Sequence, residues 1–135
     1  MTAAPFELPV RVYIEDTDTG GIVYYVNYLK YMERARTELM RSLGYGKEFI
    51  CNFDLMFVVR DVALKYRGPA TLDDQLTANA RLVRLGRASM VFAQEILRGE
   101  EVLVTGEVTV ACVDREGVKP RPMPAALLVS LRGLQ

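Results

Sequence analysis

Three acidic side chains crowd into the segment EDTDTGG, residues 15 to 21, between the apolar run VRVYI and the aromatic stretch IVYYVNYLKY. Its two glycines, Gly20 and Gly21, would let the backbone approach a ligand closely. A carboxylate just before a helix N-terminus lies beside unpaired backbone N–H groups, at the positive end of the helix dipole. Those donors can polarise a carbonyl oxygen, so the segment has the minimum equipment for acyl transfer by a carboxylate nucleophile or base.

The chain contains no histidine. This absence excludes Ser-His and Cys-His nucleophile pairs, imidazole general bases and histidine-ligated zinc. Any acid–base chemistry near neutral pH must therefore come from Asp, Glu, Lys, Tyr or Cys side chains.

Three other interpretations of the acidic segment are open. It could be only a turn, because Asp, Thr and Gly are turn formers. D-T-D-T-G-G is similar to the start of an EF-hand, but position five is Gly20 and position twelve is Asn27, not the bidentate glutamate. A strand followed by Asp-x-Asp resembles the nucleophile motif of haloacid-dehalogenase-type phosphatases, but one helix followed by four strands argues against their doubly wound fold. No metal is therefore expected.

The periodicity of apolar residues predicts one strand, one long helix and then four strands. Residues 9–15 alternate as a short strand, and apolar positions from Tyr28 to Leu43 recur at helical spacing, with Asn27 as N-cap and Gly44 just past the end. The later strands are residues 57–67 and an antiparallel meander of residues 75–84, 87–98 and 101–113, before a short C-terminal helix. The prediction is an α+β fold, a single domain over residues 1–135, in which one long helix packs against a curled antiparallel sheet.

Composition limits the partners and the compartment. The 17 basic and 17 acidic residues balance, without a block of five like charges, which disfavours nucleic acid as the main partner. No apolar run reaches the roughly 18 residues that a membrane span needs. Cys51 and Cys112 have neither metal-ligand nor disulfide-framework spacing, and there is no signal peptide, so a reducing cytoplasm is expected.

Residues 10–45, VRVYIEDTDTGGIVYYVNYLKYMERARTELMRSLGY, resemble the signature of hotdog-fold acyl-CoA thioesterases. The segment is similar to the 4-hydroxybenzoyl-CoA thioesterase group and, most of all, to the bacterial acyl-CoA thioesterases encoded beside the Tol–Pal envelope system. The resemblance continues through FVVRDVALKYRGPATLDDQL, ASMVFAQEI, VTVACVD and KPRPMP, and so covers nearly the whole chain. It implies a hotdog fold and hydrolysis of acyl-CoA without a cofactor, with acyl carrier protein as a further candidate partner.

The same resemblance implies roles for individual residues. Asp18 would be the catalytic carboxylate, as nucleophile or as base for a water, and the backbone N–H of Tyr25 would be the oxyanion donor. The active sites would form between the subunits of a homodimer or homotetramer. The candidate substrate-binding residues, at the thioester carbonyl, along the pantetheine arm and at the CoA phosphates, are Gly21, Val23, Tyr24, Tyr28, Val58, Val59, Arg87 and Lys119.

The chain departs from the closest subgroup at one position. The Tol–Pal-associated enzymes have a histidine in the pattern VYHANY, whereas this chain has VYYVNY, with Tyr25 at that position. In this respect the chain is similar to the 4-hydroxybenzoyl-CoA enzymes. The acyl preference of the Tol–Pal-associated subgroup therefore does not carry over. Glu33 could be a second carboxylate at the site or an ion-pair partner of Arg34 or Arg36, and Tyr28 could equally be a core residue. The rival function is a non-catalytic acyl-CoA or acyl-carrier-protein binding module. A hotdog dehydratase would be expected to use the missing histidine.

Overall fold

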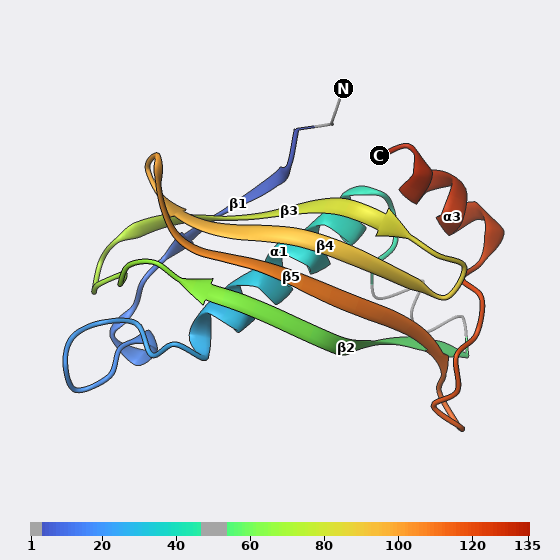
Figure 1. Cartoon of the computed structure of the whole chain (residues 1–135), viewed down its shortest axis with the longest axis horizontal. Helices are drawn as coiled ribbons and strands as arrows, with labels where there is room; N and C mark the ends of the chain where they lie inside the picture. Colours follow the sequence, from blue (N-terminus) through green and yellow to red (C-terminus); the bar gives the residue numbers. More distant parts are fainter. Residues whose placement is uncertain (1–3, 47–53) are drawn as a thin grey trace.

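The computed structural model describes residues 4–46 and 54–135, which form one sheet, one long helix and a shorter C-terminal helix (Figure 1). Cys51 lies outside the described residues. The elements in chain order are β1 (Phe6–Arg11), the 3-10 turn η1 (Ile14–Asp16), α1 (Asn27–Ser42), β2 (Leu55–Tyr66), β3 (Gln75–Leu85), β4 (Ser89–Arg98), β5 (Glu101–Asp114) and α3 (Ala125–Arg132).

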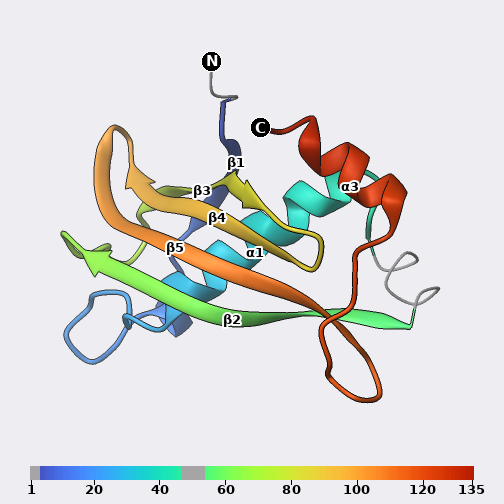
Figure 2. The same ribbon diagram turned by 45° about the vertical axis from the view of Figure 1, so that its right-hand side comes forward.

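The five strands form one antiparallel sheet in the order β1-β3-β4-β5-β2. The predicted meander is confirmed as β3, β4 and β5, while β1 and β2 form the two edges. Figure 2 shows the sheet curling over α1, which contacts β1, β3 and β4. The predicted arrangement of one long helix against a curled antiparallel sheet is therefore confirmed.

The core lies between α1 and the concave face of the sheet. Helix residues at spacings of three and four are buried there, namely Tyr28, Tyr31, Met32, Ala35 and Leu39. They belong to one cluster with inward-facing strand residues such as Phe92, Ile96, Val104 and Val108. Because burying one large apolar side chain stabilises a fold by about 1.5–3 kcal/mol, this packing holds α1 firmly. The start of α1 is therefore a rigid support for the acidic segment before it.

The structure corrects the predictions for the first strand and the helix start. Residues 9–15 do not form one strand, because β1 ends at Arg11 and the chain curls into η1. The Asp16 carboxylate causes this curl by accepting a hydrogen bond from the Tyr13 N–H, at 2.9 Å. Asn27 is the first residue of α1 and not its N-cap, since Val26 precedes the helix. Gly44 lies just past the helix with φ +92°, as predicted.

A β-bulge at Arg60 changes the phase of β2. Strict alternation along residues 57–67 would put Val58 and Val62 on one face. In the structure Val59 pairs with Val110 and Val62 with Val108, both core residues, so Val59 and Val62 face the helix side. Val58 faces the opposite side.

Gly106 of β5 pairs with Leu64 of β2 on the helix side of the sheet. A Cβ at position 106 would collide with the Leu64 Cδ2 atom. Glycine here makes room for the Leu64 side chain within the core.

Candidate active site

Asp18 lies in a short hairpin that precedes α1. Thr17 and Val23 form a bridge, and the Asp18 N–H donates to the Ile22 carbonyl at 2.9 Å. At the tip, the Gly21 N–H donates to the Asp18 carbonyl at 3.1 Å, and the Gly20 N–H donates to Asp18 Oδ1 at 2.8 Å. The exposed carboxylate therefore has one oxygen held by the turn, while Oδ2 has no partner within residues 4–46 and 54–135.

The base of this hairpin is tied back to the helix. The Asp16 carbonyl accepts two hydrogen bonds, from the Tyr24 N–H at 2.9 Å and from Asn27 Nδ2 at 2.8 Å. The Asn27 N–H in turn donates to the Tyr24 carbonyl at 2.8 Å. These three hydrogen bonds join Asp16, Tyr24 and Asn27, so the base of the hairpin is held against the start of α1.

The backbone N–H of Tyr25 has no acceptor in the part of the chain that the structure describes. It lies just before the first residue of α1, where the helix dipole adds positive potential. Tyr25 as a residue is 57% exposed, so it lies at the surface of the molecule. A free donor at a helix start is what an oxyanion requires.

Tyr66, at the end of β2, packs against the start of α1 and was not predicted as a site residue. Its ring lies edge-on to that of Tyr25 at 6.0 Å and at 5.8 Å from that of Tyr28, and its hydroxyl donates to the Tyr25 carbonyl at 3.4 Å. Burial, with the neighbouring Tyr25 and Tyr28 hydroxyls, raises the pKa of Tyr66, so its hydroxyl stays protonated at neutral pH. The half-exposed Tyr24 extends this aromatic wall, 5.0 Å from the Tyr25 ring.

Two of the predicted substrate-binding residues lie in the core. Val23 and Tyr28 are each 3% exposed. The Val23 N–H donates to the Ala70 carbonyl at 2.8 Å, and the Ala70 N–H donates to the Tyr28 hydroxyl at 3.0 Å. Burial raises the pKa of Tyr28. Of the two interpretations of Tyr28, the structure places its side chain in the core.

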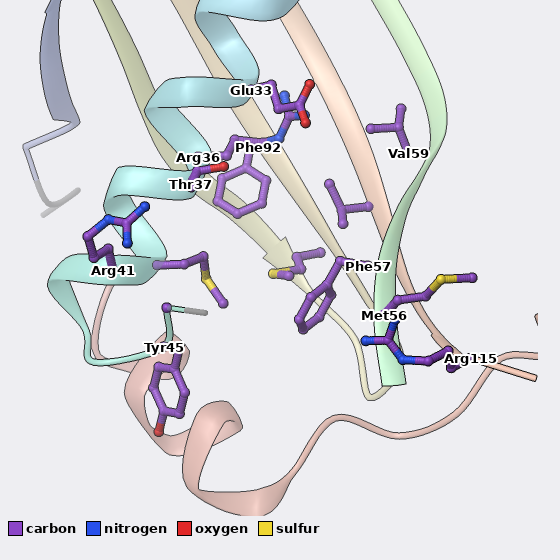
Figure 3. A pocket seen from close by; sticks show the side chains of 14 residues that line it. Glu33, Arg36, Thr37, Arg41, Tyr45, Met56, Phe57, Val59, Phe92 and Arg115 are labelled. Carbon is purple, nitrogen blue, oxygen red and sulfur yellow. The ribbon is translucent and has the colours of Figure 1, made fainter. Parts of the chain in front are cut away.

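A pocket of about 500 Å³ opens between the second half of α1 and the first half of β2 (Figure 3). Figure 3 shows Glu33, Arg36 and Thr37 projecting from α1 opposite Met56 and Phe57 of β2. The pocket's apolar walls are Met40, Met56, Phe57, Val59, Met90, Phe92 and Val110. The predicted Val59 lines this pocket, whereas Val58 does not.

Arg36 is the most buried cation of the pocket. Its Nη1 donates to Gln94 Oε1 at 2.9 Å, and burial lowers its pKa. Gln94 uses both Nε2 hydrogens on the Met32 and Asn79 carbonyls, so its oxygen must face Arg36. The ion pair predicted for Glu33 is not formed among the described residues, although Arg36 feels the Glu33 charge.

The two predicted phosphate-binding cations lie far from Asp18 in the same copy. Arg87 is in the turn between β3 and β4 and lines a second pocket, of about 210 Å³, beside α3. Lys119 is exposed in the loop after β5. Figures 1 and 2 show the β3–β4 turn and the acidic hairpin at opposite ends of the molecule. One copy therefore does not bring Asp18 and Arg87 together.

No group of three His, Cys, Asp or Glu side chains gathers at metal-ligand distance within residues 4–46 and 54–135. Across the same residues, no helix is long and apolar enough to cross a membrane.

Comparison with known proteins identifies the family. The model of the thioesterase superfamily matches residues 20–105. The chain is 38% identical over 133 residues to the acyl-CoA thioester hydrolase YbgC of Escherichia coli O6:H1, covering 98% of this chain and 99% of that protein. It is 38% identical over 131 residues to the acyl-CoA thioesterase YbgC of Haemophilus influenzae, covering 96% of each.

Solved structures agree with the sequence comparisons. The crystal structure of a probable thioesterase from Bartonella henselae is 38% identical, with a TM-score of 0.84 over 90% of this chain and 100% of that one. A DHNA-CoA thioesterase structure from Staphylococcus aureus, at 18% identity and a TM-score of 0.90, shows the same fold. The predicted hotdog fold is thus confirmed, and the chain belongs to the thioesterase superfamily.

Proposed function

We propose that this protein hydrolyses acyl-CoA thioesters to the free acid and CoA, with Asp18 as the catalytic carboxylate. The observation that carries the proposal is the hairpin itself, which holds an exposed Asp18 carboxylate just before a helix start with a free Tyr25 N–H. The names of the E. coli and H. influenzae relatives support acyl-CoA as the substrate class.

The chemistry needs no histidine. The thioester carbonyl oxygen would accept the Tyr25 N–H, and losing such a donor typically costs about 3–4 kcal/mol of transition-state stabilisation. Asp18 either attacks the carbonyl carbon, releasing the CoA thiolate and leaving a mixed anhydride, or removes a proton from an attacking water. In the first route, water hydrolyses the anhydride to the acid and restores Asp18.

Asp18→Asn tests this proposal, because asparagine keeps the shape of the side chain and removes its charge. Thiol release is followed with acetyl-, hexanoyl-, palmitoyl- and benzoyl-CoA. We expect the wild type to cleave at least one of these and the variant to lose activity by orders of magnitude while staying folded. Asp73→Asn is the matched control, an exposed turn aspartate at φ +69°, which asparagine tolerates.

Two results would contradict the proposal. If Asp18→Asn matches the wild type, Asp18 is only a turn residue. If the wild type releases no thiol but its melting temperature rises with CoA, the non-catalytic binding module is the better description.

We further infer that the complete site forms between two copies that pair along β2. This edge strand has twelve residues, about 40 Å, and exposes Val59, Val62 and Tyr66 on its helix side. Long apolar edge strands are sites of pairing with another chain. Antiparallel pairing would put the start of one β2, with its pocket, beside the end of the other β2, where Tyr66 contacts Tyr25.

This arrangement explains why the parts of the site are separated within one copy. The pocket would take the acyl group of a thioester that Asp18 of the second copy cleaves, and Arg87 and Lys119 would approach the CoA phosphates from the same side as the pocket. Charge-assisted hydrogen bonds from Arg suit such phosphates. A pairing of two dimers into a tetramer would use another surface.

Val62→Lys tests the pairing, because it places a charge in an apolar surface that both copies would share. We expect a monomer by sedimentation analysis and a large loss of thiol release. Val83→Lys is the control, since Val83 is similarly exposed, at 41% against 44%, but lies on the internal strand β3. A Val62→Lys dimer with wild-type activity would contradict the pairing.

Three expectations from the sequence stay predictions. These are acyl carrier protein as a further partner, a cytoplasmic location, and the absence of nucleic acid among the partners.

A further inference from the structure

We propose that Asn27 is a positioning residue that sets the distance between the Asp18 carboxylate and the Tyr25 N–H. The inference rests on the hydrolase function proposed above and deepens it. Asn27 does not touch a reacting atom in this role. It acts through the hairpin that carries Asp18 and through the peptide group that carries the Tyr25 N–H.

The side chain of Asn27 anchors the base of the hairpin. It is 8% exposed, and its Nδ2 donates to the Asp16 carbonyl at 2.8 Å, across eleven residues. This link comes from the first residue of α1, directly after the N-cap residue Val26. From there the Thr17–Val23 bridge leads directly to Asp18 at the tip. A shift at Asp16 therefore moves the carboxylate.

The backbone of Asn27 fixes the other half of the site. Its N–H donates to the Tyr24 carbonyl at 2.8 Å. Because a peptide group is planar and trans, the Tyr24 carbonyl and the Tyr25 N–H point in opposite directions. Because the Tyr24 carbonyl points toward α1, the Tyr25 N–H points away from α1. The Tyr24 N–H, which donates to the same Asp16 carbonyl as Asn27, completes the cycle.

A single residue of the rigid helix is therefore hydrogen-bonded to both catalytic elements. This matters because a misplacement of about 1 Å in a catalytic group can cost roughly 100-fold in rate. Without the Nδ2 donor, the Asp16 carbonyl keeps the Tyr24 N–H, and Val23 stays linked through Ala70 to the Tyr28 hydroxyl of α1. The hairpin would therefore persist but lose its direct side-chain bond to α1, and Asp18 would be held less precisely. The expected defect lies in turnover and not in binding.

The test compares Asn27→Ala and Asn27→Asp with the wild type. Aspartate keeps the size of the side chain, so it leaves no cavity, but it faces the Asp16 carbonyl with an acceptor and therefore removes the same hydrogen bond. We expect kcat to fall about 10- to 100-fold for the best acyl-CoA of the panel, while KM stays within about threefold. Hydrogen exchange of the segment from Asp16 to Tyr25 should accelerate.

Asn79→Ala is the matched control. Asn79 is equally buried, at 5%, and its side chain makes two hydrogen bonds with Glu95, at 2.6 and 3.0 Å, within the sheet. Its removal should lower the melting temperature and leave kcat unchanged. A purely structural role for Asn27 would make its variants behave in the same way.

The outcomes separate the two proposals. If the wild type cleaves thioesters and both Asn27 variants keep kcat within twofold, or lose no more than Asn79→Ala, the positioning role is wrong although the hydrolase stands. Faster hydrogen exchange with an unchanged kcat would also overturn it. If the wild type releases no thiol from any acyl-CoA, the hydrolase proposal fails and the role of Asn27 falls with it. Should Asn27→Ala not fold, the isosteric Asn27→Asp decides.

Discussion

Replacing Gly21 by alanine should separate the stability of the acidic hairpin from its catalytic role. Gly21 has φ +82°, and an added Cβ would meet no atom of the described residues within 4 Å. The cost is therefore backbone strain alone, about 1–2 kcal/mol for an L-residue in the left-handed region. For a chain of this size, each 1 kcal/mol lowers the melting temperature by roughly 4 °C. We expect Gly21→Ala to melt about 4–8 °C below the wild type.

Gly44→Ala provides the comparison. Gly44 has φ +92°, and a Cβ there would also meet no atom of residues 4–46 and 54–135 within 4 Å, but Gly44 lies at the other end of α1 from the hairpin. It should lose the same stability and keep its kcat. Gly21→Ala should lose at least about tenfold in kcat, because the Gly21 N–H closes the turn on the Asp18 carbonyl, and relief of strain moves the carboxylate.

The assays are thermal unfolding at one fixed protein concentration and thiol release from acyl-CoA. Equal activity losses in the two variants would show that the effect is not local to the hairpin. A Gly21→Ala enzyme with the predicted melting temperature and wild-type kcat would refute the idea that this turn positions Asp18. Unchanged melting temperatures in both would refute the strain argument.

Two further predictions concern stability. Hydrogen bonds from the Thr71 N–H and, to a lesser extent, from the Arg98 guanidinium at 2.7 Å hold the pKa of Asp74 below its usual value near 3.8. The Asp74 carboxylate therefore stabilises the fold above pH 3.8. This stabilisation is lost as the pH falls through the lower pKa of the folded state. Urea unfolding should find Asp74→Asn about 1–3 kcal/mol less stable at pH 7, with the difference vanishing in acid; a constant difference would contradict it. Gly106→Ala should lower the free energy of unfolding by about 1–3 kcal/mol, because the added methyl group forces the Leu64 side chain aside. In a Leu64→Ala background the same substitution should cost little. If the costs of the two substitutions simply add, the collision is excluded.

Much of the fold could be predicted because its signals are local. The helical spacing from Tyr28 to Leu43 and the glycine at 44 lie within one short stretch, and the meander strands are joined by short turns. The acidic segment could likewise be recognised as a turn before a helix, with Asp18 at its tip. These features depend on a few neighbouring residues, and the structure has them where the sequence indicated.

The remaining parts depend on contacts that the sequence does not reveal. The apolar alternation in β2 fits either phase, so the bulge at Arg60 and the inward position of Val59 could not be read from it. The first strand ends early where the Asp16 carboxylate turns back and accepts a hydrogen bond from the Tyr13 N–H, an interaction that the apolar pattern does not show. Tyr66 reaches Tyr25 across 41 residues, which only the folded topology determines.

The role of the Asn27 side chain also could not be predicted from local sequence. Asparagine before a helical pattern is a good N-cap, and propensity favours that interpretation. In the structure Asn27 is the first helical residue, and its Nδ2 donates to the Asp16 carbonyl, eleven residues back. The sequence did not reveal this bond between distant residues, and the bond belongs to the candidate site.

The open edge of β2 also affects how readily a single copy aggregates before it pairs with a second copy. A newly made copy would expose the backbone groups along the outer edge of β2, beside Val59 and Val62. Other extended chains could add strands to this edge and form an aggregate. Arg60 and Asp61, paired at 3.2 Å on the bulge, and the exposed Lys65 interrupt this edge with charge. These charges act as gatekeepers against foreign strands. A variant that removes them should give a lower soluble yield than the wild type when both are made under the same conditions.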